Sequence, residues 1–74
     1  MNIDVELFGQ LLQGMRRRRT LTLEQPAKIR EVANLLGLKT SEVGLITMNG
    51  VQSELDDFVS PDSRVCFFPH MSGG

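Results

Sequence analysis

The sequence predicts a single α+β domain in which one helix lies across one face of a sheet. Two segments with strand-like alternation come first, one segment with helical periodicity follows, and further strand-like segments complete the chain without repeats or a low-complexity linker. A chain of 74 residues has room for one compact core. Its 41% hydrophobic and 23% charged residues are typical of a globular protein that folds.

The N-terminal third predicts a hairpin of two strands. Apolar and polar residues alternate strictly over residues 2–7, so one face of this strand is expected to pack and the other, which includes Glu6, to face solvent. Residues 10–14 contain two adjacent leucines and end in a glycine, which indicates a loop or a single helical turn. Residues 20–24 alternate again and form the second predicted strand.

One amphipathic helix is predicted from Lys28 to about Leu36. Pro26 suits its first turn, because a proline there loses no helical hydrogen bond. Gly37 suits the position just after the helix, where the chain turns left-handed. The apolar residues with helical spacing are Ile29, Val32, Ala33 and Leu36.

The segment after the helix predicts a short turn, a strand and a tight reversal. Thr40 or Ser41 is expected to cap the turn, and residues 45–48 to form the strand. The Asn-Gly pair at residues 49–50 favours a type I′ turn, because both residues tolerate positive φ. A return strand should start there, and residues 52–63 read mainly as an irregular connection over the surface.

Residues 64–68 form the last predicted strand. The segment is continuously apolar after Arg64, which is typical of a central strand buried on both faces. Pro69 is expected to stop its hydrogen-bond ladder. We therefore divide the chain into a domain at residues 1–69 and an extended C-terminal tail at residues 70–74.

The end of the chain carries the most specific motif, an apolar strand closed by a proline and followed by a diglycine. It resembles the small subunit of molybdopterin synthase and the thiamine-pathway sulfur carrier, both of the ubiquitin-like sulfur-carrier family (MoaD/ThiS). The likeness extends to residues 5–9 and 48–50, although His70 replaces the second proline of such tails and residues 61–64 replace an acidic-glycine turn. The motif reads Val65-Cys66-Phe67-Phe68-Pro69 and then Ser72-Gly73-Gly74.

The resemblance implies a ubiquitin-like β-grasp fold, with a mixed sheet of four to five strands and one main helix packed across it. It also implies a sulfur carrier, whose Gly74 carboxylate is adenylated with ATP and converted to a thiocarboxylate for molybdopterin (molybdenum or tungsten cofactor) biosynthesis. Glycines at positions 73 and 74 let the tail thread a narrow channel. The aromatic-aromatic-proline lead favours the molybdopterin branch. A thiamine-pathway carrier, a ubiquitin-like protein modifier and an interaction module with an inert tail remain alternatives.

The resemblance implies two protein partners, a ubiquitin-activating-type adenylating enzyme and a synthase large subunit. The chain is then a carrier that donates sulfur within the synthase, without enzyme activity or bound cofactor of its own. The partners are expected to read the tail and an apolar patch of the sheet. Core packing is favoured for Phe67 and Phe68, but the second also belongs to the expected partner-contacting set. That set comprises Phe68, Pro69, His70, Met71 and Ser72.

Other candidate residues favour ordinary structural roles. The four consecutive arginines at Arg16 to Arg19 indicate a solvated loop, with steering of an acidic partner as the alternative. Cys66 lies in an apolar strand, where a thiol is usually inert. His70, the only histidine, cannot assemble a zinc cluster and is expected to be exposed and unliganded. Asp56 and its neighbour at position 57 are interpreted as solvated loop residues.

Composition limits the class of function. A net charge of −1 argues against a nucleic-acid surface, and no apolar run approaches the roughly 20 residues that span a bilayer. With one cysteine and no signal-peptide pattern at the N-terminus, the sequence predicts a reducing, cytoplasmic setting.

Overall fold

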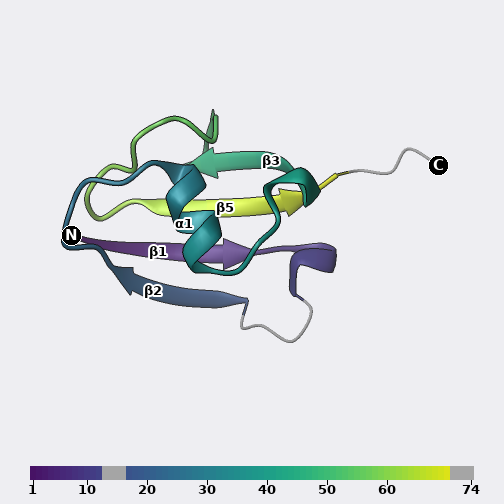
Figure 1. Cartoon of the computed structure of the whole chain (residues 1–74), viewed down its shortest axis with the longest axis horizontal. Coiled ribbons are helices and arrows are strands. Elements are labelled where there is room, and N and C mark those ends of the chain that lie inside the picture. The colour runs from purple at the N-terminus through teal and green to yellow at the C-terminus, as the bar shows by residue number, and fades with distance from the viewer. Residues whose placement is uncertain (13–16, 71–74) are drawn as a thin grey trace.

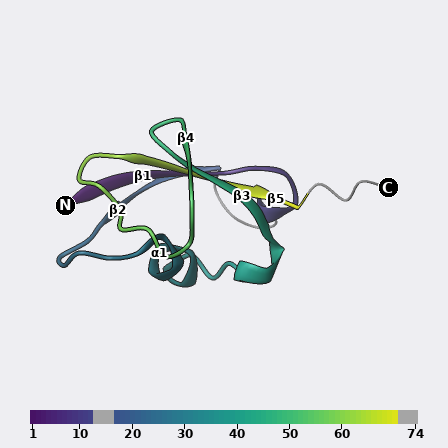
Figure 2. The ribbon, with the colours of Figure 1, turned by 90° about the horizontal axis from the view of Figure 1, so that it is seen from above.

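The computed structural model describes residues 1–12 and 17–70 as one five-stranded mixed sheet with a helix on one face (Figure 1). The strand order is β2-β1-β5-β3-β4, with β1 and β5 parallel and the other neighbours antiparallel. Figure 2 shows α1 on one side of the sheet and no helix of the described residues over the other side, which we call the outer face. The elements are β1 (Asn2–Leu7), the 3₁₀ turn η1 (Gly9–Leu12), β2 (Arg18–Thr22), α1 (Ile29–Leu35), the 3₁₀ turn η2 (Thr40–Glu42), β3 (Val43–Met48), β4 (Val51–Ser53) and β5 (Arg64–Pro69). The predicted α+β architecture is confirmed.

The N-terminal hairpin is confirmed, but its second strand lies earlier than predicted. β1 has the predicted bounds, whereas β2 begins at Arg18 and ends at Thr22 instead of covering residues 20–24. β2 starts earlier than predicted because Arg18 lies opposite Glu6 and forms an ion pair with it. The pairing of the two strands therefore extends to Arg18 and Arg19. The predicted turn between the strands is present as η1.

The helix starts later than predicted, and Pro26 is not in its first turn. Lys28 is the N-cap residue, with an extended backbone. The preceding segment is held by the connection between β4 and β5: the Val59 amide donates to the Ala27 carbonyl at 2.9 Å, and Lys28 forms an isolated β-bridge with Phe58. These bonds take the backbone groups that a longer helix would need. At the other end the prediction for Gly37 is confirmed, since its φ is 78°.

The middle of the chain largely follows the prediction. Asn49 and Gly50 have φ of 53° and 81°, which confirms the tight turn. The short 3₁₀ turn is confirmed as η2, but Lys39 is its N-cap and no side chain caps it. β3 begins at Val43, and β4 takes the first two residues of the segment that was expected to be irregular.

β5 is the central strand, as predicted, but it is covered on one face only. Val65 and Phe67 are fully buried against the helix side, whereas Cys66 and Phe68 are half-buried on the outer face. The prediction of burial on both faces was wrong because no described helix packs against the outer face. The strand also runs through Pro69, which pairs with Val43, since a proline that cannot donate still accepts with its carbonyl.

Candidate functional site

The chain leaves the sheet at Pro69 and His70, and two glycines allow the neighbouring backbone to approach this point closely. A Cβ on Gly9 would lie 2.9 Å from Pro69 Cγ, and the φ of Gly9 is +59°. A Cβ on Gly44 would lie 2.7 Å from His70 Cα and 2.8 Å from the Pro69 carbonyl oxygen. Any larger residue would push this backbone away. We call this point, defined by Gly9, Gly44, Pro69 and His70, the exit.

His70 ties the exit to the neighbouring 3₁₀ turn. Its Nε2 donates a hydrogen bond to the Ser41 carbonyl oxygen at 2.9 Å. The side chain is exposed, as predicted. No group of three or more metal-ligating His, Cys, Asp or Glu side chains occurs in the described part of the chain. The hydrogen bond to Ser41 holds the first residue beyond β5 against η2.

An apolar patch borders the exit on the outer face. The rings of Phe8 and Phe68 stack with centroids 4.5 Å apart and an interplanar angle of 10°. Leu45 lies opposite Phe68 in the β3–β5 register and is 39% exposed. We call these three residues the outer-face patch. Core packing is confirmed for Phe67 but was wrong for Phe68, because successive side chains of a strand point to opposite faces.

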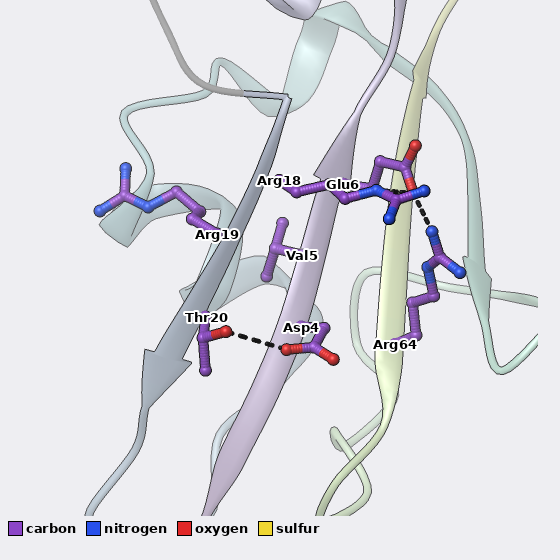
Figure 3. Close-up of a pocket in the computed structure, with 7 residues that line it drawn as sticks. All are labelled: Asp4, Val5, Glu6, Arg18, Arg19, Thr20 and Arg64. Carbon is purple, nitrogen blue, oxygen red and sulfur yellow. Dashed lines mark hydrogen bonds and ion pairs between the residues drawn. The ribbon is translucent and has the colours of Figure 1, made fainter.

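A carboxylate and two guanidinium groups form a cluster beside this patch (Figure 3). The Glu6 side chain is only 7% exposed, although the alternation predicted that it faces solvent. It accepts a hydrogen bond from Arg64 and lies 3.4 Å from Arg18 Nε. Arg17 places its guanidinium 5.7 Å from the Phe8 ring centroid, within the range of a cation–π interaction. Arg17 therefore borders the patch.

The ion pairs keep Glu6 ionised. The hydrogen bond from Arg64 lowers the pKa of Glu6 below its usual 4.5, and the charge of Arg18 acts in the same direction. Burial opposes this by raising the pKa, but its effect is smaller than that of the Arg64 hydrogen bond. In turn, the carboxylate holds Arg18 and Arg64 together on the outer face.

We expect Glu6→Gln to destabilise the fold in a pH-dependent way. Because the pKa of Glu6 is lower in the folded chain, its contribution to stability is present above about pH 4.5 and is lost as the pH falls through the folded-state pKa. The variant should therefore melt below wild type near neutral pH, with a difference that shrinks as the pH is lowered below about 4.5. Thermal unfolding over a pH series measures this, with exposed Glu42→Gln as a control. A difference that stays the same over the whole series would contradict it.

The other residues that the sequence singled out are two aspartates and a cysteine. Asp56 forms an ion pair with Arg30 of α1 at 3.1 Å, and Asp57 accepts a hydrogen bond from the Glu54 amide at 2.8 Å. Both aspartates are exposed, and both also stabilise the connection between β4 and β5. Cys66 is a half-buried free thiol opposite Glu6 on the outer face. No helix in the described residues is long and apolar enough to cross a membrane.

Several predicted site residues lie outside the described residues. They are Arg16, Met71, Ser72, Gly73 and Gly74. The expectations for the diglycine and for most of the tail therefore stay predictions. Sequence reasoning missed Glu6, Gly9 and Gly44. Leu45 was within a predicted strand, but nothing in the sequence set its register against Phe68.

No family model matches this chain, and no curated protein matches its sequence. Solved structures do share its architecture. Small archaeal modifier protein 1 (SAMP1) of Haloferax volcanii superposes with a TM-score of 0.76 at 20% identity, over all of both chains. The chain has the ubiquitin-like β-grasp fold of the MoaD/ThiS-type sulfur carriers.

Two further structures with this fold are described as parts of a molybdopterin-converting factor. The putative subunit 1 from Pyrococcus furiosus gives a TM-score of 0.70 at 18% identity, covering 92% of this chain and 95% of that one. One chain from a complex of subunits 1 and 2 from Helicobacter pylori gives a TM-score of 0.64 at 18% identity, covering all of this chain and all of that one. At these identities the likeness concerns the fold.

Proposed function

We propose that this chain is a sulfur carrier, and that the outer-face patch beside the exit docks the proteins that modify and use its C-terminal carboxylate. The placement of the patch carries the proposal, because Phe8, Leu45 and Phe68 form an apolar surface next to the point where the chain leaves the fold. The two converting-factor neighbours support a synthase large subunit as one such partner.

The chemistry requires an activating enzyme, because a carboxylate is a poor electrophile. In the first step, a Gly74 carboxylate oxygen attacks the α-phosphorus of ATP, giving an acyl-adenylate and pyrophosphate. In the second step, a sulfide-level donor attacks the acyl carbon and AMP leaves, which produces the thiocarboxylate. The ATP belongs to the adenylating enzyme, and the chain supplies only the carboxyl group. Donation of that sulfur to a molybdopterin precursor would take place on the synthase, in the cytoplasm.

The described residues would orient the tail in these steps. The close approach of Gly9 and Gly44 and the His70 hydrogen bond fix the direction in which the chain leaves β5. A fixed exit reduces the conformational entropy lost when the tail enters a partner's channel. Stacked aromatic side chains bury a large apolar area at an interface at low cost in side-chain entropy.

Intact-protein mass spectrometry tests this function directly. The chain ending at Gly74 is incubated with an adenylating enzyme from the same source, ATP and sulfide. A mass gain equal to replacement of one oxygen by sulfur, located at Gly74, is the expected result. No gain with an enzyme that is active on another carrier would refute the sulfur-carrier proposal.

A protein modifier is the second candidate function, and the likeness to small archaeal modifier protein 1 favours it. The same acyl-adenylate would then be attacked by a lysine amine of another protein, giving an isopeptide bond and releasing AMP. Trypsin-digested cell extracts would contain lysines that carry the C-terminal peptide of this chain beginning at Val65, because Arg64 is its last trypsin site. The amount would depend on this chain. The two functions share the activation step and differ in what attacks the acyl carbon.

A further inference from the structure

The β2 edge of the sheet offers unpaired backbone groups. Among the described strands β2 pairs only with β1. The Leu23 amide donates to the Met1 carbonyl at 2.7 Å, at the end of this ladder. Since backbone groups alternate in direction along a strand, the amides and carbonyls of Arg18, Thr20 and Thr22 point away from β1. They can accept another strand.

A hollow with acidic residues lies beside the end of this edge. It has a volume of about 560 Å³ and lies between the segment after β2 and the helix. Its apolar lining includes Leu23 and Leu35, and Leu35 is 66% exposed although it belongs to α1. Glu24 and Glu31 add two carboxylates. An apolar surface with carboxylates suits the long stem and charged head of an arginine.

Arg19 is such a side chain, and it belongs to the same edge. It lies opposite Val5, a core residue, so it leaves β2 on the helix side of the sheet. Figure 3 shows Arg18 directed toward Glu6 and Arg19 directed the other way. Arg19 is exposed, whereas Arg18 is already engaged by Glu6.

We propose that two copies of this chain pair through their β2 edges, antiparallel, with Arg19 of each copy entering the hollow of the other. The outward-facing groups match when Thr20 lies opposite Thr22 of the second copy. In this register Arg19 lies opposite Leu23 of the second copy, at the border of its hollow. Leu21, which is half-buried, then faces its own equivalent across the two-fold axis. The interface is isologous and therefore closes as a dimer.

Charge complementarity favours a second copy over other occupants. Edge strands usually avoid pairing by carrying charged side chains, because an unpaired charge at the interface is unfavourable. A parallel or shifted pairing of the two β2 strands would leave the arginines without acidic partners. The antiparallel register instead brings Arg19 of each copy to the Glu24 carboxylate that lines the hollow of the other copy. The proposed dimer also leaves the exit accessible, because β1 separates β2 from β5.

Sedimentation velocity over a concentration series, at low salt, tests the dimer without ATP or any partner protein. Wild type should shift from 8.3 kDa toward twice that mass as the concentration rises. Thr20→Pro removes one outward-facing amide, and a proline is tolerated at such an edge position. Arg19→Glu and Glu24→Arg each place like charges together. Each change should weaken the dimer about tenfold or more, and the double variant Arg19→Glu/Glu24→Arg should restore it.

Controls separate pairing from folding and from net charge. Lys39→Glu makes the same charge change as Arg19→Glu at an exposed site outside this edge, and should dimerise like wild type. Circular dichroism melts should show each variant folded, and amide exchange at Thr20 and Thr22 should slow as wild type dimerises.

A wild type that stays monomeric, or single variants that dimerise like wild type, would overturn the proposal. A monomer that binds an arginine-containing extended peptide at Leu35 would assign the hollow to another protein. Singles that dissociate without rescue in the double would overturn the register.

Discussion

Deletion of Gly74 should abolish thiocarboxylate formation completely and leave the fold unchanged. The reacting carboxylate would move to Gly73 and lie about 3.3 Å closer to the domain, because each residue of an extended chain spans about that length. A catalytic site that holds the carboxylate within hydrogen-bond distance of ATP does not tolerate such a shift. The described contacts of the C-terminal segment end at His70, so none of them is lost.

The experiment compares sulfur incorporation with thermal stability in the same samples. Ser72→Gly keeps the tail length and the diglycine, and serves as the matched control that still accepts sulfur. A chain with extra residues after Gly74 should also fail, because its carboxylate is displaced in the other direction. If the deletion variant gained sulfur at the wild-type rate, the carrier function of Gly74 would be refuted. If all three tails behaved alike in every partner assay, the tail would be inert.

Elements with a strong local pattern could be predicted from the sequence. The bounds of β1 and the end of α1 depend on alternation, helical spacing and Gly37, and all three signals are local. The start of β2 depends instead on which residue of β1 it faces. Pro26 was misplaced in the same way, since the bonds that hold Ala27 extended come from a segment about thirty residues later.

The candidate site depended still more on distant contacts. Glu6 is buried because Arg64, 58 positions away, lies beside it on the neighbouring strand. Gly9 and Gly44 look like ordinary loop or strand glycines until the sheet brings both of them to Pro69 and His70. The sequence could indicate that the last strand ends near Pro69. It could not indicate what fixes the direction of the chain at His70.

Replacing each of two adjacent phenylalanines by alanine should have different main effects: the change at Phe67 should lower stability, and the change at Phe68 should weaken partner binding. Phe67 is 0% exposed and is the largest fully buried side chain, so Phe67→Ala should cost about 3–5 kcal/mol of the free energy of unfolding. Small domains have about 5–15 kcal/mol in total, so this variant loses a large part of its stability. Phe68→Ala loses the stacking contact with Phe8, about 0.5–1.5 kcal/mol, and with it part of the proposed docking surface.

The pair forms a control for itself, because both changes remove the same atoms from the same strand. Urea unfolding should place Phe67→Ala well below wild type and Phe68→Ala close to it. At a temperature where both are folded, Phe68→Ala should raise the KM of the adenylating enzyme for the carrier more than Phe67→Ala does. This follows because interface energy is concentrated in large side chains that a partner desolvates. Equal losses of stability would mean that Phe68 belongs to the core, whereas an unchanged KM for Phe68→Ala would remove the outer-face patch from the docking surface and leave the tail as the sole recognition element.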